Sequence, residues 1–213
     1  MCSEDKPAQN TDSVYAQLVG KHPAPPSDRG SVPDPQPTVA VEMTEEELIR
    51  AVRSIPPGSA GDPDEVRPQH TLEMVSCRES GTELRSALTG FVNCLLQGHI
   101  HPQVSPVLFG GSLIALEKKF GGIRPIAVGY TLRRIVAKCA NSYATNQIAG
   151  YFSPIRLGVG TPRGSEAAVH ATRRFIEAMP DGHVVAKLDF CNAFNSLRRD
   201  LMLRSVISAV QDI

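Results

Sequence analysis

Asp189 is the residue in this chain whose type and position point most clearly to chemistry. It directly follows Val184 to Leu188, a run that is apolar except for Lys187 and is of a kind typical of a strand buried in a sheet. A carboxylate at the end of such a strand can bind a divalent metal ion, because Mg²⁺ prefers oxygen ligands. Two Mg²⁺ ions can bridge the attacking and leaving oxygens of a phosphoryl or nucleotidyl transfer. The spacing leaves one alternative open, in which Asp189 caps the turn before the next helix.

Basic side chains gather near a glycine pair at 121–122. Two short runs of strand-forming residues, 112–118 and 123–128, flank this pair and predict a β-hairpin. The basic residues beside the turn are Lys118, Lys119 and Arg124. Lysine carries a mobile point charge and arginine a planar fork of donors, so together they can clamp the phosphates of a nucleotide. The alternative is a solvated turn whose side chains bind nothing.

The segment from Leu188 to Ser196, which reads LDFCNAFNS, resembles the first palm motif of reverse transcriptases of the non-LTR retrotransposon type. The resemblance implies that Asp189 binds both catalytic Mg²⁺ ions and that the main-chain carbonyl of Phe190 adds a ligand. It also implies that Phe194 stacks under the nucleotide sugar and acts as a steric gate against a 2′-hydroxyl. If the motif is ignored, core packing explains Phe194 equally well.

Two further segments resemble motifs of the same family. Residues 116–126, LEKKFGGIRPI, resemble the fingers hairpin, which implies that Arg124 and either Lys118 or Lys119 contact the triphosphate of an incoming dNTP. Residues 157–165, LGVGTPRGS, resemble a turn associated with the template strand. That resemblance implies that Arg163 contacts a template phosphate, and the helix N-terminus after it would favour the same anion.

A fourth segment, Met43 to His70, resembles a helix and loop that precede the fingers hairpin in the family. The family usually has glycine where this chain has Asp62 and Glu65. If the loop needs positive φ at those positions, these substitutions are expected to strain it by about 1 kcal/mol.

The four motifs occur in the family's order, and together they imply an RNA-directed DNA polymerase, which is a nucleotidyltransferase. Its expected partners are an RNA or DNA template-primer, dNTP and Mg²⁺. The chain stops soon after the first palm motif. The paired aspartates of the second palm motif are therefore expected to be missing, so we expect a truncated enzyme that is inactive alone. The alternatives are a non-catalytic nucleic-acid-binding or inert relic fragment, and an unrelated α/β protein with chance motifs.

The helices and strands expected to position these residues indicate an α+β fold. The resemblance implies that this fold comprises the fingers and an incomplete palm of a right-hand polymerase. Residues 1–42 are rich in proline and polar residues and are expected to form a disordered leader. Residues 43–213 are expected to form the partial reverse transcriptase domain. Its expected helices begin at Thr44, span 84–95, 131–148 and 167–178, and follow a cap at Ser196. On the second of these helices, the apolar face is expected to be Leu84, Leu88, Phe91 and Leu95.

Composition is consistent with a protein inside the cell. The net charge is zero, but residues 1–80 carry 7 basic and 14 acidic residues, against 15 and 8 in residues 81–213. A basic second part suits a polyanion, although solvated helix faces explain it as well. The five cysteines are scattered, no apolar run reaches the length of a membrane helix, and no signal peptide is apparent. A cytoplasmic or nuclear location is therefore expected.

Overall fold

The structure, a computed structural model, describes residues 6–31, 41–152, 156–158 and 161–210. Helices dominate it, and one two-stranded sheet is present among the described residues, so the expected α+β class is confirmed. The chain divides into two compact units. The first contains Met1–Ala24 with Asp34–Ser142, and the second contains Pro25–Pro33 with Tyr143–Ile213. The longest helix, α6 (Thr131–Phe152), contributes residues to both units.

The first unit contains a helical layer whose members are α2 (Glu45–Arg53), α3 (Pro68–Val75), α4 (Gly81–Leu96) and the short α5 (Ser105–Leu108). The expected start at Thr44 is confirmed. The Thr44 side chain accepts a hydrogen bond from the Glu47 N–H at 3.3 Å, and the Glu47 carboxylate accepts one from the Thr44 N–H at 2.9 Å. This reciprocal capping box pairs two donors that a helix end leaves without partners.

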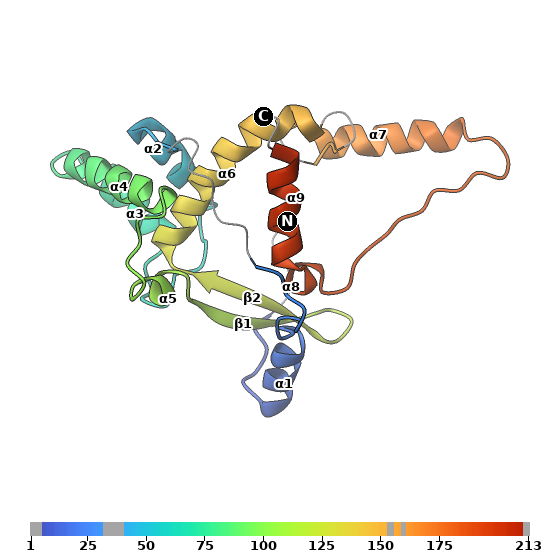
Figure 1. Cartoon of the computed structure of the whole chain (residues 1–213), viewed down its shortest axis with the longest axis horizontal. Helices are drawn as coiled ribbons and strands as arrows, with labels where there is room; N and C mark the ends of the chain where they lie inside the picture. The colour runs from blue at the N-terminus through green and yellow to red at the C-terminus, as the bar shows by residue number, and fades with distance from the viewer. Residues whose placement is uncertain (1–5, 32–40, 153–155, 159–160, 211–213) are drawn as a thin grey trace. The chain divides into compact units, whose positions relative to one another are not determined.

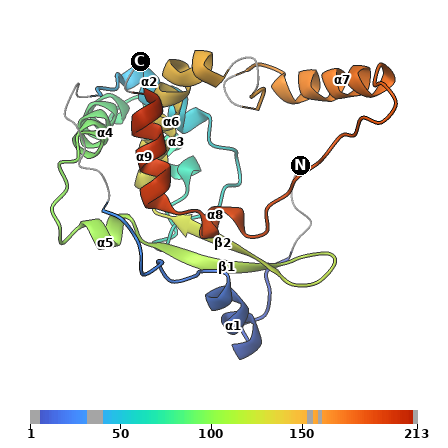
Figure 2. The same ribbon diagram turned by 45° about the vertical axis from the view of Figure 1, so that its right-hand side comes forward.

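The hydrophobic core of this unit lies between α2, α3, α4 and the first turns of α6, which Figures 1 and 2 show side by side. Its fully buried aliphatic residues are Leu48, Val52, Val75, Val92 and Ile135. The predicted face of α4 is partly wrong. Leu88 is buried as expected, but Phe91 is 37% exposed and Val92 takes the next core position. Residues four apart lie on one side of a helix, so Leu88 and Val92 point the same way.

The predicted hairpin is confirmed. Strand β1 (Gly111–Glu117) pairs antiparallel with β2 (Ile123–Gly129), and Leu116 lies directly opposite Arg124. Figure 1 shows the two strands as a long ribbon with its turn at one end. Buried residues alternate with exposed ones at the start of β2, where Ile123 is 3% exposed and Arg124 is exposed. This alternation anchors one face of the ribbon and leaves the basic side chain on the other.

The expectation of a disordered leader is wrong for part of residues 1–42. Asp12–Gly20 form helix α1, whose N-cap Thr11 accepts a hydrogen bond from the Val14 N–H at 3.3 Å. The leader also pairs with the sheet, because the Lys6 carbonyl accepts from the Glu117 N–H at 2.8 Å. Sequence reasoning gave weight to the prolines and overlooked an N-cap followed by apolar residues at helical spacing. Residues 1–5 and 32–40 of the leader lie outside the described part of the chain.

The helices of the second unit are the C-terminal part of α6, α7 (Gly164–Glu177), the short α8 (Ala193–Ser196) and α9 (Arg199–Val210). The predicted helix at 167–178 is confirmed, with a start three residues earlier. The predicted cap at Ser196 is wrong, since this residue ends α8. The first turn of α9 instead holds the buried Asp200, which accepts hydrogen bonds from the Gly30 N–H at 3.0 Å and from Arg198 at 2.8 Å.

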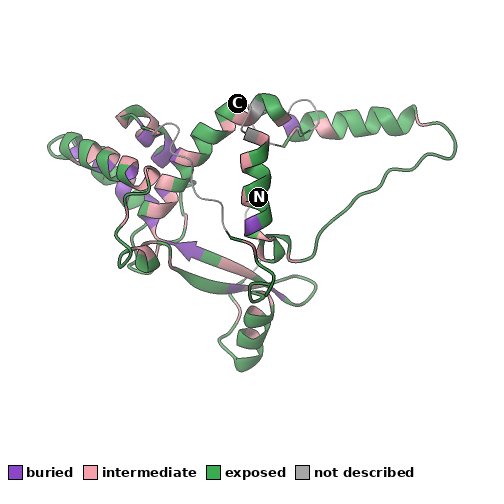
Figure 3. Cartoon of the chain, in the orientation of Figure 1, coloured by how far each residue is buried: buried purple, intermediate pink, exposed green. Residues whose placement is uncertain are grey.

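The prediction of a buried strand at 183–190 is wrong. These residues are extended without strand pairing, and every one is exposed (Figure 3). Val184 is 84% exposed and Leu188 81%. A strand needs a hydrogen-bonded neighbour, and no described residue supplies one.

Candidate functional site

The candidate site is the turn of the β1–β2 hairpin, where residues 118–122 connect the two strands. The Gly121 N–H donates to the Lys118 carbonyl at 3.0 Å, and the Lys118 N–H donates to the Gly122 carbonyl at 3.0 Å. Gly121 and Gly122 have φ values of +90° and +77°. Such angles are strained for residues with a Cβ, so the glycine pair permits this tight reversal.

The structure brings the three predicted phosphate-binding residues onto one hairpin. Lys118, Lys119 and Arg124 are all exposed there, on either side of the turn. Phe120 stands between them at the tip and is 95% exposed. The arrangement presents mobile ammonium groups and a planar guanidinium, which suits an anion with several oxygens.

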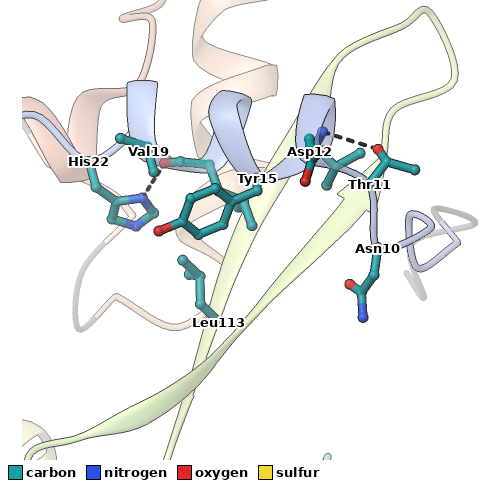
Figure 4. Close-up of a pocket in the computed structure, with 9 residues that line it drawn as sticks. Asn10, Thr11, Asp12, Tyr15, Val19, His22 and Leu113 are labelled. Carbon is teal, nitrogen blue, oxygen red and sulfur yellow. Dashed lines mark hydrogen bonds between the residues drawn. The ribbon is translucent and has the colours of Figure 1, made fainter.

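The leader borders this turn, which sequence reasoning did not predict. A shallow cavity of about 240 Å³ lies beside the turn. Its lining includes Lys118, Gly121 and Gly122 from the hairpin, and Ala8, Val14 and Gln17 from the leader. On the neighbouring surface, Tyr15 and Val19 of α1 lie near Leu113 of β1 (Figure 4). The only signal for this packing is the apolar spacing of the α1 residues.

A polar network joins the loop at 59–68 to the start of α6. The Asp62 carboxylate accepts hydrogen bonds from the N–H groups of Thr131 at 3.0 Å, Val66 at 2.9 Å and Asp64 at 3.1 Å. The buried Thr131 hydroxyl donates to the Val66 carbonyl at 2.6 Å. Burial alone would raise the pKa of Asp62, but these N–H donors outweigh it and lower the pKa below its ordinary value. The network places the helix that follows the hairpin against this loop.

The same loop contains the left-handed residue that its resemblance to the family suggested. Glu65 has a φ of +63°, whereas Asp62 is not among the described residues with positive φ. A Cβ at Gly61 would lie 3.1 Å from the Glu65 carbonyl oxygen, so the loop is also crowded there. One of the two expected positions of strain is therefore confirmed.

Asp189 belongs to the second unit and lies in the exposed, extended segment described above. Phe190 is 76% exposed, and Phe194, in α8, is 92% exposed, so the core-packing alternative for Phe194 is not what the structure has. Asn192 turns the chain between them with a φ of +53°. The alternative role expected for Asp189 was to cap the turn before the next helix. The N-cap of that helix, α8, is Asn192 instead.

The described residues do not by themselves fit the two Mg²⁺ ions that the resemblance implies. Within these parts of the chain, no group of three or more His, Cys, Asp or Glu residues could hold a metal ion. Asp189 therefore belongs to no group of three or more such ligands in the described part of the chain.

Arg163 lies directly before α7, as expected, and is exposed with a φ of +56°. Gly164 behind it is buried, and a Cβ there would overlap the Leu157 carbonyl oxygen. The glycine is thus required by close packing of the turn. Val159 and Gly160 of this motif lie outside the described residues.

No protein-family model, curated protein or solved structure matches this chain. None of the helices in the described ranges has the length and apolar character needed to cross a membrane. Function is therefore inferred from the residues and their geometry.

Proposed function

We propose that this chain is the fingers and first palm segment of a reverse transcriptase of the non-LTR retrotransposon type. Such an enzyme is an RNA-directed DNA polymerase, and the hairpin turn would bind the phosphates of a dNTP or of a template-primer. The observation that carries the proposal is the exposed set Lys118, Lys119 and Arg124 on a hairpin closed by two glycines.

Two features of the first unit support the proposal. Glu65 adopts a left-handed conformation at a position where the resemblance suggests glycine. The Asp62 network then ties this loop to α6, which directly follows the hairpin. A hairpin held at its base by packed helices can keep its charged tip in place, which favours phosphate binding over a solvated turn.

Polymerisation by these 213 residues alone is not part of the proposal. Two-metal nucleotidyl transfer needs several oxygen ligands in fixed positions, and Asp189 is the one acidic residue that the motif assigns here. We therefore expect binding without primer extension, with Mg²⁺ as the ion of the complete enzyme.

The binding test uses fluorescence anisotropy with a labelled RNA–DNA primer-template and, separately, a fluorescent dNTP. Replacing both Lys119 and Arg124 with glutamine should weaken binding by about 10- to 100-fold, or about 1.4–2.7 kcal/mol for the two contacts together. Both side chains are exposed, so each contact contributes less than the roughly 1.5–3 kcal/mol of a charge-assisted hydrogen bond shielded from water. The slope of log K against the logarithm of the salt concentration should also become shallower, by the amount expected for the loss of about one to two phosphate contacts.

The matched control is the double substitution Arg53→Gln and Arg78→Gln. These side chains are exposed on the same unit and lie away from the hairpin. Their replacement removes the same two positive charges as the hairpin variant. Equal affinities for the two double variants would refute the hairpin as a phosphate-binding site.

Primer extension with dNTPs and Mg²⁺ distinguishes a working polymerase from a fragment that binds nucleic acid without catalysis. No extension is expected. Extension that Asp189→Asn abolishes would show that these residues form a working polymerase and would overturn the proposed inactivity.

A further inference from the structure

Residues 184–190 of the second unit have the sequence of a strand but no strand beside them. Among the described residues, their backbone groups make no hydrogen bond to another segment. The run contains no Gly or Pro and carries one Lys and one Asp, so its net charge is zero. An exposed, extended run of this composition is a template for pairing with another chain.

We propose that this segment pairs with the same segment of a second copy of the chain, as antiparallel strands centred on Leu188. In this register, Lys187 of each copy lies opposite Asp189 of the other copy. The two-fold symmetry makes this pair twice, and Leu188 lies opposite its own counterpart. Opposite charges directly across an antiparallel pair stabilise it, whereas like charges destabilise it.

The charge pattern selects this register against its neighbours. An antiparallel pairing centred on Lys187 would place the two lysines opposite each other, and one centred on Asp189 would place the two aspartates opposite each other. A parallel stack in register would set both like-charge pairs side by side. Thus the register centred on Leu188 is the one of these that joins opposite charges.

The alternation of side chains selects it as well. Every second residue, Val184, Ala186, Leu188 and Phe190, is apolar. Residues directly opposite each other point to the same face of a sheet. A register centred between two residues would set the apolar face of one copy beside the polar face of the other, because a slip of one residue reverses the faces.

Exposed apolar surface of the same unit lies beside the start of this segment, where Val184 belongs to the apolar face and Val185 to the other face. A shallow groove beside Val184 and Val185 is lined by Ala171, Thr172 and Phe175 of α7. Phe175 is 53% exposed. Two isolated strands are only marginally stable in water, so apolar burial at this groove would add to the hydrogen bonds between the copies.

The test measures the mass of the full chain by sedimentation equilibrium over a hundred-fold range of concentration. The wild-type chain should show a concentration-dependent dimer. Lys187→Glu and Asp189→Lys each replace both opposite-charge pairs with like-charge pairs, so each should weaken dimerisation by about tenfold or more. The double variant restores opposite charges in reverse and should dimerise like the wild type.

Mixing the two single variants gives a sharper result. In the mixed pair, the new glutamate of K187E would face the new lysine of D189K. The unchanged Asp189 of the first variant would face the unchanged Lys187 of the second. The mixture should therefore form a heterodimer at concentrations where each variant alone is a monomer. A merely structural effect of either substitution would not be rescued by the other variant.

Lys138→Glu is the matched control, since it makes the same charge change at an exposed position of α6. It should leave the dimer unchanged. A wild-type monomer throughout the range, larger open assemblies in place of a dimer, or equal weakening by Lys138→Glu would each overturn the inference. The inference does not depend on the polymerase proposal, whose test uses hairpin variants and ligand binding.

Discussion

Removing the Asp62 carboxylate should destabilise the first unit, because this group caps α6 from a distant loop. Of its three N–H donors, those of Asp64 and Val66 lie in an exposed loop and can bind water instead. Thr131 is 0% exposed, so its N–H would be left without a partner. A buried, unsatisfied donor that had bound a charged acceptor costs roughly 2–3 kcal/mol, so this is the expected loss for Asp62→Ala. Asp62→Asn keeps one acceptor oxygen and should lose about 1 kcal/mol.

Hydrogen exchange at the Thr131 amide is the suitable assay, because circular dichroism would add the helices of both units. The expected loss for Asp62→Ala corresponds to exchange about 30- to 150-fold faster at neutral pH, if exchange follows opening of this unit. Asp64→Ala is the control. The Asp64 carboxylate makes no hydrogen bond or ion pair within the described residues, so the substitution should have little effect.

The pH dependence gives an independent check. The pKa of Asp62 is lowered in the folded state, so its contribution is complete above the ordinary value of 3.8 and is lost as the pH falls through the lowered value. The difference between wild type and Asp62→Asn should therefore shrink in acid. Exchange at Thr131 that is unchanged by Asp62→Ala, or a difference that is as large in strong acid as at neutral pH, would refute this account of the network.

Two other substitutions test local features. Glu65→Gly should stabilise the first unit by about 1 kcal/mol in thermal unfolding, since glycine removes the strain of a φ of +63°; Glu65→Ala retains the strain and should give no such gain. Arg198→Gln should speed trypsin cleavage after Arg29, because Arg198 binds both Asp28 and Asp200 at 2.8 Å and holds the pKa of Asp200 well below its usual range. Unchanged cleavage, or the same change with the exposed control Arg199→Gln, would contradict a role for Arg198 in holding this segment.

Local sequence patterns predicted most of the helices and the hairpin. The capping box at Thr44 and Glu47 acts within one helical turn, so the residues that form it specify the helix start. The hairpin at 111–129 depends on two strand-forming runs and a glycine pair between them. In each case the interacting groups are close in sequence, and few alternative structures compete.

Patterns that need a distant partner were less informative. The apolar run at 183–190 has strand composition, but no described residue pairs with it, so it remains extended and exposed. The leader was expected to be disordered, yet contact with β1 accompanies an ordered helix in residues 12–20. Composition measures the average tendency of a segment, whereas pairing with another segment decides its structure.

The candidate site divides in the same way. Sequence alone determined that Lys118, Lys119 and Arg124 share one hairpin and that Asp189 follows an apolar run. Tertiary structure alone decided that a carboxylate 69 residues earlier in the chain, on Asp62, caps the helix after that hairpin. A hairpin is closed by neighbours in the chain, but the acceptor for a buried N–H can come from any segment that packing brings within reach.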